Sequence, residues 1–517
     1  MYGITHPHFF EHGSQFGSER ENQLHLFLTH KIVSIIIDSA NIQIYSQITT
    51  TFSQYLKKKY YICKKRTMKA RFLVAAISSG CGKTTLTVGL LRVLALRGLH
   101  VQPFKCGPDY IDTQYHQQAC GTESVNLDTW FADADHLEDV FRYYGADADV
   151  CVVEGVMGLF DGYRQWHGSA AEVASLLRLP VVLVVNARSM AFSAAAIIRG
   201  FRDMMADLLP GGPSSTSAIV GVIFNQVGSP RHDRLLREAC EAVGITCLGT
   251  IHRLKTMEVP SRHLGLTLEN KAAIESFISQ AAQTVASNID IDQLLAVCSA
   301  VNEPLAKDQE QPSTEMERKK DDSSLFTPHA SRKIAVARDE AFNFTYRENI
   351  DWLRSRGDVV FFSPLNDESL PPGTDFLYLP GGYPEFFLPA LSHNKAMQRA
   401  IADYIEGGGH ALAECGGMMY LCRSIIDEKG NHWPMVGILA QDATMEGKRL
   451  HLGYRELNGL RGHEFHYSTI VGEEAALVQG HWLTTNGEPA TPYYIYKNLV
   501  AGYTHIYFPS SRTFFLP

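Results

Sequence analysis

The sequence predicts an α/β protein made of two doubly wound domains. Three observations lead to this prediction. Over residues 68–301, continuous apolar runs such as Val181–Val185 alternate with amphipathic helical patterns, and the same alternation starts again at Lys333. Continuous runs rich in Val and Ile are typical of parallel strands buried on both faces. Residues 302–332 are polar and charged, so we expect them to link the first domain to a second one at 333–517.

Five strands are expected in the first domain and four in the second. Those of the first are Phe72–Ile77, Val101–Phe104, Asp149–Val153, Val181–Val185 and Ala218–Phe224. Those of the second are Ile334–Ala337, Asp358–Phe362, Phe376–Leu379 and Ala411–Ala413. In sheets of this kind, functional side chains lie at the carboxyl ends of the strands. The residues that follow each strand are therefore the candidates for chemistry.

The composition is that of a globular protein, with 45% hydrophobic and 20% charged residues. The net charge of -8 argues against nonspecific nucleic-acid binding, and no apolar run reaches the roughly 20 residues of a membrane helix. Ten cysteines without CxxC pairs or a secretory leader indicate reduced thiols and a cytoplasmic protein. Residues 1–67 are expected to be a weakly ordered extension, or to follow an upstream start that is not used, since Met68 stands shortly before the first strand. Their short apolar run comes too late for a signal peptide.

A glycine-rich turn follows the first strand and precedes an apolar helical pattern from Leu86 to Leu96. A strand, a glycine turn, Gly-Lys-Thr and a helix together wrap backbone N–H groups around the phosphates of a nucleotide. The residues expected to contact the nucleotide are Gly80, Cys81, Gly82, Lys83, Thr84 and Thr85. Lys83 should hold the outer phosphates, and the Thr84 hydroxyl should bind Mg²⁺. The match is imperfect, because a full Walker A motif has glycine where Ile77 stands.

Two further strands of the first domain end in charged residues. Glu154 follows Asp149–Val153, where a carboxylate beside a P-loop is placed to bind the metal or a metal-bound water. Lys105 and Asp109 lie in the turn after Val101–Phe104. Because the strands are parallel, these residues should share one sheet edge with the P-loop.

A cysteine flanked by glycines follows the strand Ala411–Ala413 of the second domain. Cys415 has the surroundings of a nucleophile elbow, and the helix that follows should favour its thiolate. Gly381 and Gly382 follow another strand and would let backbone N–H groups approach an oxyanion. The base must be a histidine distant in sequence. The candidates are His451, His463, His466 and His505.

Several motifs, taken together and in order, resemble the cobyrinate a,c-diamide synthase family. They are Ser79–Thr85, Phe104–Asp112, Asn126–Trp130, Glu154–Gly162 and Pro260–Leu266. This resemblance implies an N-terminal P-loop NTPase-like domain, similar to dethiobiotin synthetase, that uses ATP and Mg²⁺ to activate a carboxylate. The C-terminal motifs resemble a class I glutamine amidotransferase-like domain.

The resemblance also assigns roles in the first domain. It places Lys105 with the nucleotide, Asp109 and Asp161 near the substrate carboxylate or the phosphoryl group, and Glu154 at the metal. Asn225, after its strand, would lie near the adenine. Arg262 and His263 would contact an anionic substrate.

In the second domain the resemblance selects His505 as the partner of Cys415. Many related domains carry a glutamate two residues after this histidine, but Tyr507 stands there. The cobyrinate and cobyrate branch lacks that glutamate, so a Cys–His dyad is expected, with slow or tightly coupled glutamine hydrolysis. The segment Gly462–Ser468 resembles a family motif that we interpret as a substrate or domain contact.

The activity that the resemblance implies is amidation of the a- and c-carboxylates of cobyrinate in cobalamin biosynthesis. ATP would form an acyl phosphate, and ammonia from L-glutamine would displace the phosphate. The same chemistry on hydrogenobyrinate or nickel sirohydrochlorin is an alternative, because pocket walls set that choice. More remote alternatives are a P-loop switch ATPase with a non-catalytic glutaminase-like domain, and a glutaminase fused to a biotin-pathway ligase. We expect an anionic corrinoid partner and no nucleic-acid or membrane partner. A homodimer is compatible with the sequence, which leaves the oligomeric state open.

Overall fold

The computed structural model of the chain describes residues 70–208, 218–253, 268–300, 332–472 and 477–510. The expected extension (1–67) and nearly all of the expected linker (302–332) lie outside these ranges, as do Arg262 and His263. The expectations for those residues and for the domain boundaries therefore stay predictions.

The first domain is built on a parallel sheet of seven strands with β1 at its centre. In sheet order the strands are β3 (Val125–Leu127), β2 (Val101–Cys106), β4 (Val150–Glu154), β1 (Ala70–Ala76), β5 (Val181–Asn186), β6 (Ile219–Val227) and β7 (Thr246–His252). Every pair of neighbours in this sheet is parallel. All five expected strands are confirmed, and the structure adds β3 and β7 at the two edges.

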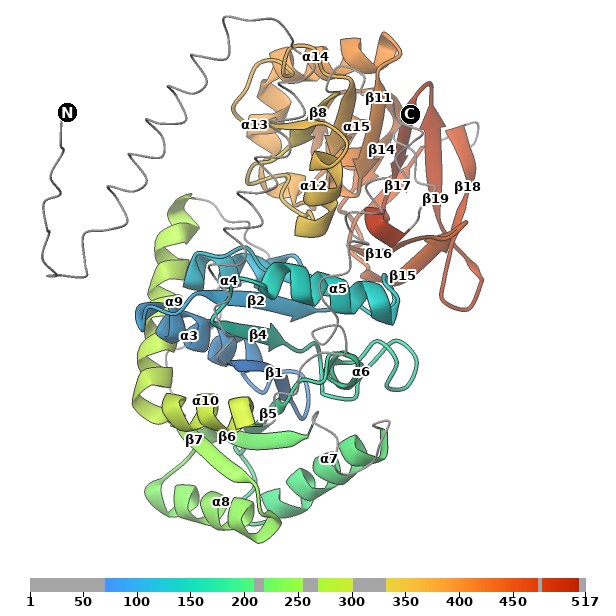
Figure 1. The fold of residues 1–517 in the computed structure, drawn as a ribbon. Helices are drawn as coiled ribbons and strands as arrows, with labels where there is room; N and C mark the ends of the chain where they lie inside the picture. The colour runs from blue at the N-terminus through green and yellow to red at the C-terminus, as the bar shows by residue number, and fades with distance from the viewer. Residues whose placement is uncertain (1–69, 209–217, 254–267, 301–331, 473–476, 511–517) are drawn as a thin grey trace, which may run out of the picture. The chain divides into compact units, whose positions relative to one another are not determined.

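Helices cover both faces of this sheet (Figure 1). One face carries α3 (Lys83–Leu96), α4 (Ile111–Cys120), α9 (Leu268–Asn288) and α10 (Ile291–Ala300). The other carries α5 (Ala134–Gly145), α6 (Ala170–Leu176), α7 (Ala194–Leu208) and α8 (Pro230–Val243). Alternate residues of β1 point into the two buried clusters, Leu73 and Ala75 into one and Phe72 and Val74 into the other. This burial on both faces explains the continuous apolar runs.

The second domain contains a mixed sheet of ten strands. Its parallel half consists of β9 (Asp358–Phe362), β8 (Lys333–Ala337), β10 (Phe376–Leu379), β11 (His410–Glu414) and β20 (Leu499–Gly502). An antiparallel half continues it through β19 (Pro489–Tyr496), β18 (Val478–Leu483), β15 (His451–Leu457), β16 (Leu460–His466) and β21 (His505–Tyr507). The four expected strands form most of the parallel half and are confirmed.

The remaining elements of the second domain flank this sheet. A smaller sheet contains β13 (His432–Pro434), β12 (Cys422–Ile426), β14 (Leu439–Thr444) and β17 (Thr469–Val471). The helices are α12 (Arg347–Arg354), α13 (Leu388–His393), α14 (Lys395–Glu406) and α15 (Gly416–Leu421), with 3-10 turns η3 (Pro384–Phe386) and η5 (Phe508–Ser510). The core with α13 to α15 and the core with α12 are separate buried clusters.

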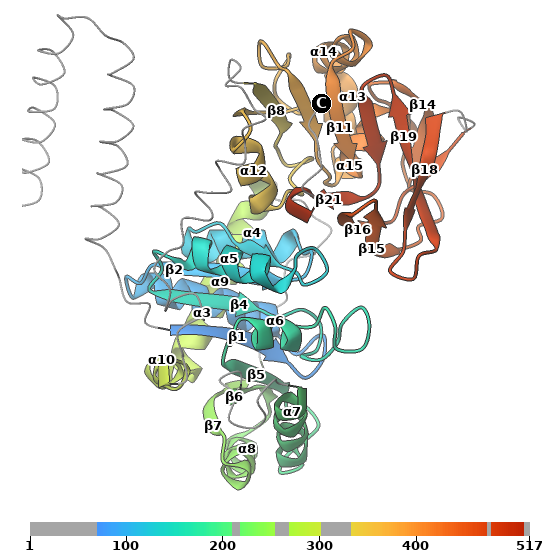
Figure 2. The same ribbon diagram turned by 45° about the vertical axis from the view of Figure 1, so that its right-hand side comes forward.

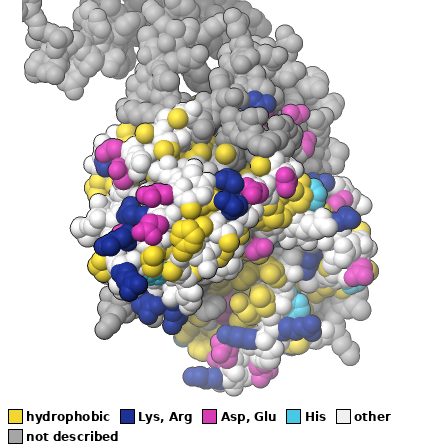
Figure 3. Space-filling view, turned by 90° about the horizontal axis from the view of Figure 1, so that it is seen from below, with side chains coloured by type: hydrophobic (Ala, Val, Ile, Leu, Met, Phe, Trp, Pro, Cys, Tyr) yellow, Lys and Arg dark blue, Asp and Glu magenta, His cyan; other side chains and the backbone are white. Residues whose placement is uncertain are grey.

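An aromatic cluster joins the two domains. Tyr110 and Phe131 of the first domain pack with Phe344, Tyr346 and Tyr507 of the second. Figures 1 and 2 show α4 and α5 on the side of the first domain that faces the second. On the face seen in Figure 3, hydrophobic side chains lie between Lys or Arg and Asp or Glu side chains. Among the described helices, none combines the length and apolarity that crossing a membrane requires.

Candidate functional site

The P-loop is the turn between β1 and α3. Gly80 and Gly82 have φ angles of +78° and +89°, which L side chains rarely adopt. Gly82 also lies against Asn225, since a Cβ on Gly82 would be 2.3 Å from Asn225 Nδ2. Asn225 Nδ2 donates a hydrogen bond to the carbonyl oxygen of Cys81 at 2.9 Å. The expectation that Asn225 follows its strand is wrong, because β6 continues to Val227 through its pairing with β5 and β7.

The first turn of α3 carries the polar groups of the motif. Lys83 Nζ donates to the carbonyl oxygen of Met157 at 2.9 Å. Burial, followed by repulsion from Lys105, lowers the pKa of Lys83. Thr84 Oγ1 donates to Glu154 Oε1 at 2.7 Å, and Thr85 is half-buried in the same turn. The P-loop hydroxyl and the carboxylate at the end of β4 therefore meet, as the sequence predicted.

Lys105 lies at the centre of a buried cluster of charges at the carboxyl ends of β2 and β4. Its Nζ is 2.6 Å from Asp112 Oδ2, 2.9 Å from Glu154 Oε1 and 3.9 Å from Asp109 Oδ2. The side chains of Lys105, Asp112 and Glu154 are at most 3% exposed. The sequence predicted that Lys105, Asp109 and Glu154 share this edge, and the structure confirms it.

Neighbouring groups set the charges in this cluster. Burial alone would raise the pKa of Glu154, but the Lys105 ammonium and a hydrogen bond from His116 outweigh it and hold that pKa well below its usual range. Burial, reinforced by Asp109, raises the pKa of Asp112 to about 6 despite the attraction of Lys105. The His116 ring is fully buried, with Nε2 2.7 Å from Glu154 Oε2 and Nδ1 3.1 Å from Ser124 Oγ.

The two other predicted carboxylates have different positions. Asp109 Oδ1 accepts hydrogen bonds from the backbone N–H groups of Ile111 and Asp112, both at 2.9 Å, and so fixes the start of α4. Asp161 Oδ2 accepts one from Gly158 N at 2.9 Å in the loop after β4. Asp161 also lines a surface hollow of about 540 Å³. The other residues lining that hollow are Phe160, Gly162, Gln165, Trp166 and Met204.

Cys415 stands at the sharp turn between β11 and α15. Its φ and ψ are +46° and -109°, a strained conformation of the kind found at nucleophile elbows. Its backbone N–H donates to the carbonyl oxygen of Gly502 at 2.7 Å. Gly416 lies against the loop after β10, since a Cβ there would be 3.0 Å from Gly382 N. The glycines beside Cys415 therefore let the elbow contact the predicted oxyanion loop.

The ring of His505 lies against the same oxyanion loop. A Cβ on Gly381 would be 2.1 Å from His505 Cε1. His505 stacks on His463, the residue opposite it in the pairing of β16 with β21, with 5.1 Å between ring centroids. His466, by contrast, stacks on His451, its partner in the pairing of β15 with β16. Of the four candidate bases, His505 is therefore the one that touches the loop beside Cys415.

The protonation states of the pair differ from the sequence expectation. Burial, with a contribution from the Glu385 carboxylate, raises the pKa of Cys415 far above that of a free thiol. Burial and the neighbouring His463 lower the pKa of His505 well below its usual value. These two shifts oppose the thiolate that the sequence predicts, and they favour a thiol and a neutral imidazole in this conformation. Within the described ranges, no hydrogen bond joins Cys415 to His505.

Among the described residues, no carboxylate is hydrogen-bonded to His505. Its Nδ1 is buried and has no hydrogen-bond partner among the described residues. The Tyr507 hydroxyl, at the place where many related domains carry the glutamate, donates to Glu348 instead. The dyad without a third member stays a prediction.

Comparisons with known proteins match both halves of the chain. Residues 72–266 match the CobQ/CobB/MinD/ParA nucleotide binding domain, and residues 333–513 match the CobB/CobQ-like glutamine amidotransferase domain. A protein of Brucella ovis named hydrogenobyrinate a,c-diamide synthase is 41% identical over 78% of this chain and 90% of its own. A cobyrinate a,c-diamide synthase from Priestia megaterium is 37% identical over 85% of this chain and 94% of its own. Another protein of that name, from a Synechococcus, is 38% identical over 84% of this chain and 94% of its own.

The chain belongs to the a,c-diamide synthase family. For a member of this family, the sequence indicated Asp112 only as a second carboxylate in the turn after Val101–Phe104, without a role of its own, and it missed His116 and Tyr110. His116 lies on α4, where a polar helix face gave no separate signal. Tyr110 lies in the motif Phe104–Asp112, but only the fold shows that its ring is 5.2 Å from that of His505.

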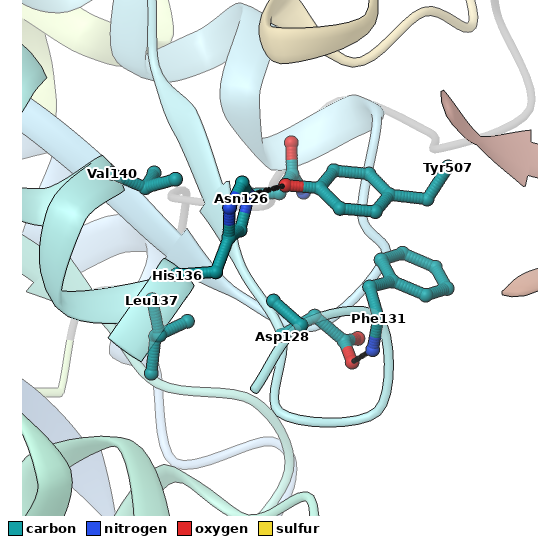
Figure 4. A pocket seen from close by; sticks show the side chains of 8 residues that line it. Asn126, Asp128, Phe131, His136, Leu137, Val140 and Tyr507 are labelled. Atoms are coloured by element: carbon teal, nitrogen blue, oxygen red, sulfur yellow. Dashed lines mark hydrogen bonds between the residues drawn. The ribbon is translucent and has the colours of Figure 1, made fainter. Parts of the chain in front are cut away.

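Polar contacts also cross between the two domains of this a,c-diamide synthase family member. His136 Nε2 lies 2.7 Å from Glu348 Oε1 and 3.1 Å from the Tyr507 hydroxyl, beside a cavity of about 10 Å³ (Figure 4). Tyr454 donates to Asp128 Oδ2 at 2.7 Å. The domain contact expected of Gly462–Ser468 is confirmed for His463, whose ring is 5.5 Å from that of Tyr110.

Proposed function

We propose that this chain amidates the a- and c-carboxylates of cobyrinate, using ATP and glutamine, in cobalamin biosynthesis. One observation carries the proposal. The chain combines a cysteine elbow, with a histidine nearby, and a P-loop with a buried Glu154. Relatives that are similar over most of the chain are named a,c-diamide synthases. The relatives favour this function over a switch ATPase or a biotin-pathway fusion, because their similarity spans both domains.

The second domain would release ammonia from glutamine. Cys415 Sγ attacks the side-chain amide carbon while its proton passes to His505, whose lowered pKa keeps a free lone pair at neutral pH. Backbone N–H groups of Gly381 and Gly382 stabilise the oxyanion. The C–N bond breaks as His505 returns the proton to the leaving nitrogen. Water then hydrolyses the thioester to glutamate and regenerates the thiol.

The first domain would activate the carboxylate. A substrate carboxylate oxygen attacks the terminal phosphorus of ATP, ADP leaves, and ammonia displaces phosphate from the acyl phosphate to form the amide. Lys83 and the backbone of Gly80–Gly82 hold the phosphates. A carboxylate is a poor electrophile at neutral pH. Ammonia from the second domain can therefore form the amide only after ATP has activated the carboxylate in the first domain.

The residues beside the P-loop fit a magnesium ion. Thr84 Oγ1, Asp112 and Glu154 supply oxygen donors, and Mg²⁺ in such sites takes one or two carboxylates and completes its shell with phosphates and water. Within the described ranges, no group of three His, Cys, Asp or Glu side chains forms a metal cage of its own. When bound, the ion neutralises charge on the transferred phosphoryl group.

The surface hollow beside Asp161 is our candidate for the corrinoid. Phe160 and Trp166 give it aromatic walls, and its loop also contains Met157 and Tyr163, which are 43% and 40% exposed. Flat macrocycles bind apolar walls of this kind. The same loop accepts the hydrogen bond of Lys83, so a macrocycle held there would have a carboxylate near the phosphates.

Hydrogenobyrinate, the cobalt-free macrocycle, is the second candidate substrate. The names of the Brucella relatives, 41% identical to this chain, favour it. A cytoplasmic location also belongs to the proposal. It is supported by nine free cysteines in the described part of the chain.

The test is an amidation assay on the purified full chain. Each macrocycle is offered with ATP, Mg²⁺ and glutamine, and the amides formed are counted by mass. Cys415→Ala should abolish the reaction with glutamine and retain it with ammonia, whereas Cys120→Ala should retain both. Failure of every macrocycle with ammonia would contradict the proposed function. Loss of the ammonia reaction in Cys415→Ala would contradict the division of labour between the domains.

A further inference from the structure

One short segment belongs to both active sites. Asp112, at the start of α4, accepts hydrogen bonds from Lys105 Nζ at 2.6 Å and Thr84 Oγ1 at 3.3 Å beside the P-loop. Tyr110, two residues earlier, reaches the other domain, with its ring centroid 5.2 Å from that of His505. The backbone between them is held by Asp109, which accepts hydrogen bonds from the backbone N–H groups of the first turn of α4. The segment Asp109–Asp112 is therefore a short covalent link between the ATP site and the glutaminase.

The Tyr110 ring is fixed among aromatic groups of the second domain. It stacks on Phe344 with 5.1 Å between centroids and an interplanar angle of 7°, and lies 4.7 Å from Tyr346 and 5.5 Å from His463. Only 7% of the residue is exposed. A ring enclosed in this way cannot shift without moving its neighbours, since packed interiors transmit displacement.

His505 depends on such contacts for its orientation. Because Nδ1 has no hydrogen-bond partner within the described ranges, the ring is held by packing. Among the described residues, the rings of Tyr110, Phe344 and His463 contact the ring of His505. Of these three, Tyr110 comes from the ATP-binding domain.

We propose that Tyr110 is a positioning residue through which the ATP site controls glutamine hydrolysis. Its ring takes over part of the orienting role that a carboxylate plays in a triad. When the partners of Asp112 change as nucleotide binds, the first turn of α4 shifts and Tyr110 moves against His505. Glutamine would then be hydrolysed fast only when the first domain is ready to use the ammonia. This inference rests on the proposed function, which supplies the two half-reactions.

The test compares Tyr110→Leu with Phe131→Leu and Tyr110→Phe. Phe131 belongs to the same aromatic cluster and the same domain, and its recorded ring contacts are with Tyr346, Tyr454, His463 and Tyr507. Glutamate release is measured with and without ATP, Mg²⁺ and macrocycle. We expect stimulation of about fivefold or more in the wild type, Phe131→Leu and Tyr110→Phe, and its loss in Tyr110→Leu.

Two further measurements separate the possible failures. Amidation with ammonia should stay near the wild-type rate in Tyr110→Leu, because that route bypasses His505. If the wild-type protein itself fails to amidate with ammonia, the proposed function is contradicted instead. In wild-type protein, a non-hydrolysable ATP analogue with Mg²⁺ should change the rate at which iodoacetamide alkylates Cys415, read by peptide mass. The inference is overturned by equal stimulation in Tyr110→Leu, by equal loss in Phe131→Leu, or by an alkylation rate that ignores the analogue.

Discussion

The Lys105 ammonium lies 2.9 Å from Glu154 Oε1, and the same oxygen accepts the hydroxyl of Thr84. The ammonium also contacts Asp112, so one buried cation compensates two buried carboxylates. In this arrangement the Lys105 ammonium neutralises the charge of the two carboxylates, as a metal cation would.

Lys105→Met should lower the free energy of unfolding by about 3–5 kcal/mol, because it leaves buried carboxylates without their cation. Urea unfolding at neutral pH measures this loss. Mg²⁺ should then raise the melting temperature of the variant more than that of the wild type, since a divalent cation can replace the ammonium. The exposed Lys429→Met serves as the control and should change neither quantity. An equal response of wild type and variant to Mg²⁺ would contradict this view of the cluster.

Glu154→Gln should reduce ATP-dependent amidation by about 100-fold or more, because charge stabilisation by a metal is worth several kcal/mol. The assay uses ammonia as nitrogen donor, so that glutamine hydrolysis does not limit the rate. Glutamine hydrolysis in the absence of nucleotide should remain close to wild type, because Cys415 lies in the other domain. Glu238→Gln on the exposed face of α8 is the matched control. Full activity of Glu154→Gln would show that the metal is held elsewhere.

Much of the first domain could be predicted because its signals are local. The runs that became β1, β2, β4, β5 and β6 are largely apolar, since helices cover both faces of that sheet. The edge strand β7 was missed because Thr246 and Gly249 interrupt its apolar pattern. The antiparallel strands β15, β18 and β19 were missed because their half-exposed residues give neither a continuous run nor a clean alternation.

The chemistry of the sites could be predicted only in part. Motif spacing placed Glu154 and Cys415 at the ends of their strands and Lys83 at the start of the helix after the first strand. Contacts between elements distant in sequence were not accessible, such as that of His116 with Glu154 or Tyr110 with His505. The raised pKa of Cys415 was also missed, because burial and Glu385 oppose the effect of the helix that begins after it.

The protonation states of the dyad predict the pH dependence of Cys415 alkylation. Burial raises the pKa of the thiol, and burial lowers the pKa of His505. A thiolate–imidazolium pair would react at a constant rate down to acidic pH. Here the thiol must lose its proton as pH rises, so the rate without ligands should increase steadily from about pH 6 to pH 10. The measurement is iodoacetamide labelling followed by mass analysis of the Cys415 peptide, with partly buried Cys120 as internal reference. A plateau below pH 7 would contradict the thiol form.

Gly381→Ala tests the contact between the oxyanion loop and His505. The new Cβ would lie 2.1 Å from His505 Cε1, and both residues are enclosed, so the ring must shift. A misplacement of this size is expected to reduce glutamine-dependent amidation by about 100-fold. Amidation with ammonia should be retained, because the first domain is unchanged. Gly200→Ala, on an exposed helix position where a Cβ meets nothing within 4 Å, is the control and should leave both reactions intact. If Gly381→Ala hydrolyses glutamine at the wild-type rate, displacing the His505 ring does not affect the reaction, and His505 is not the base.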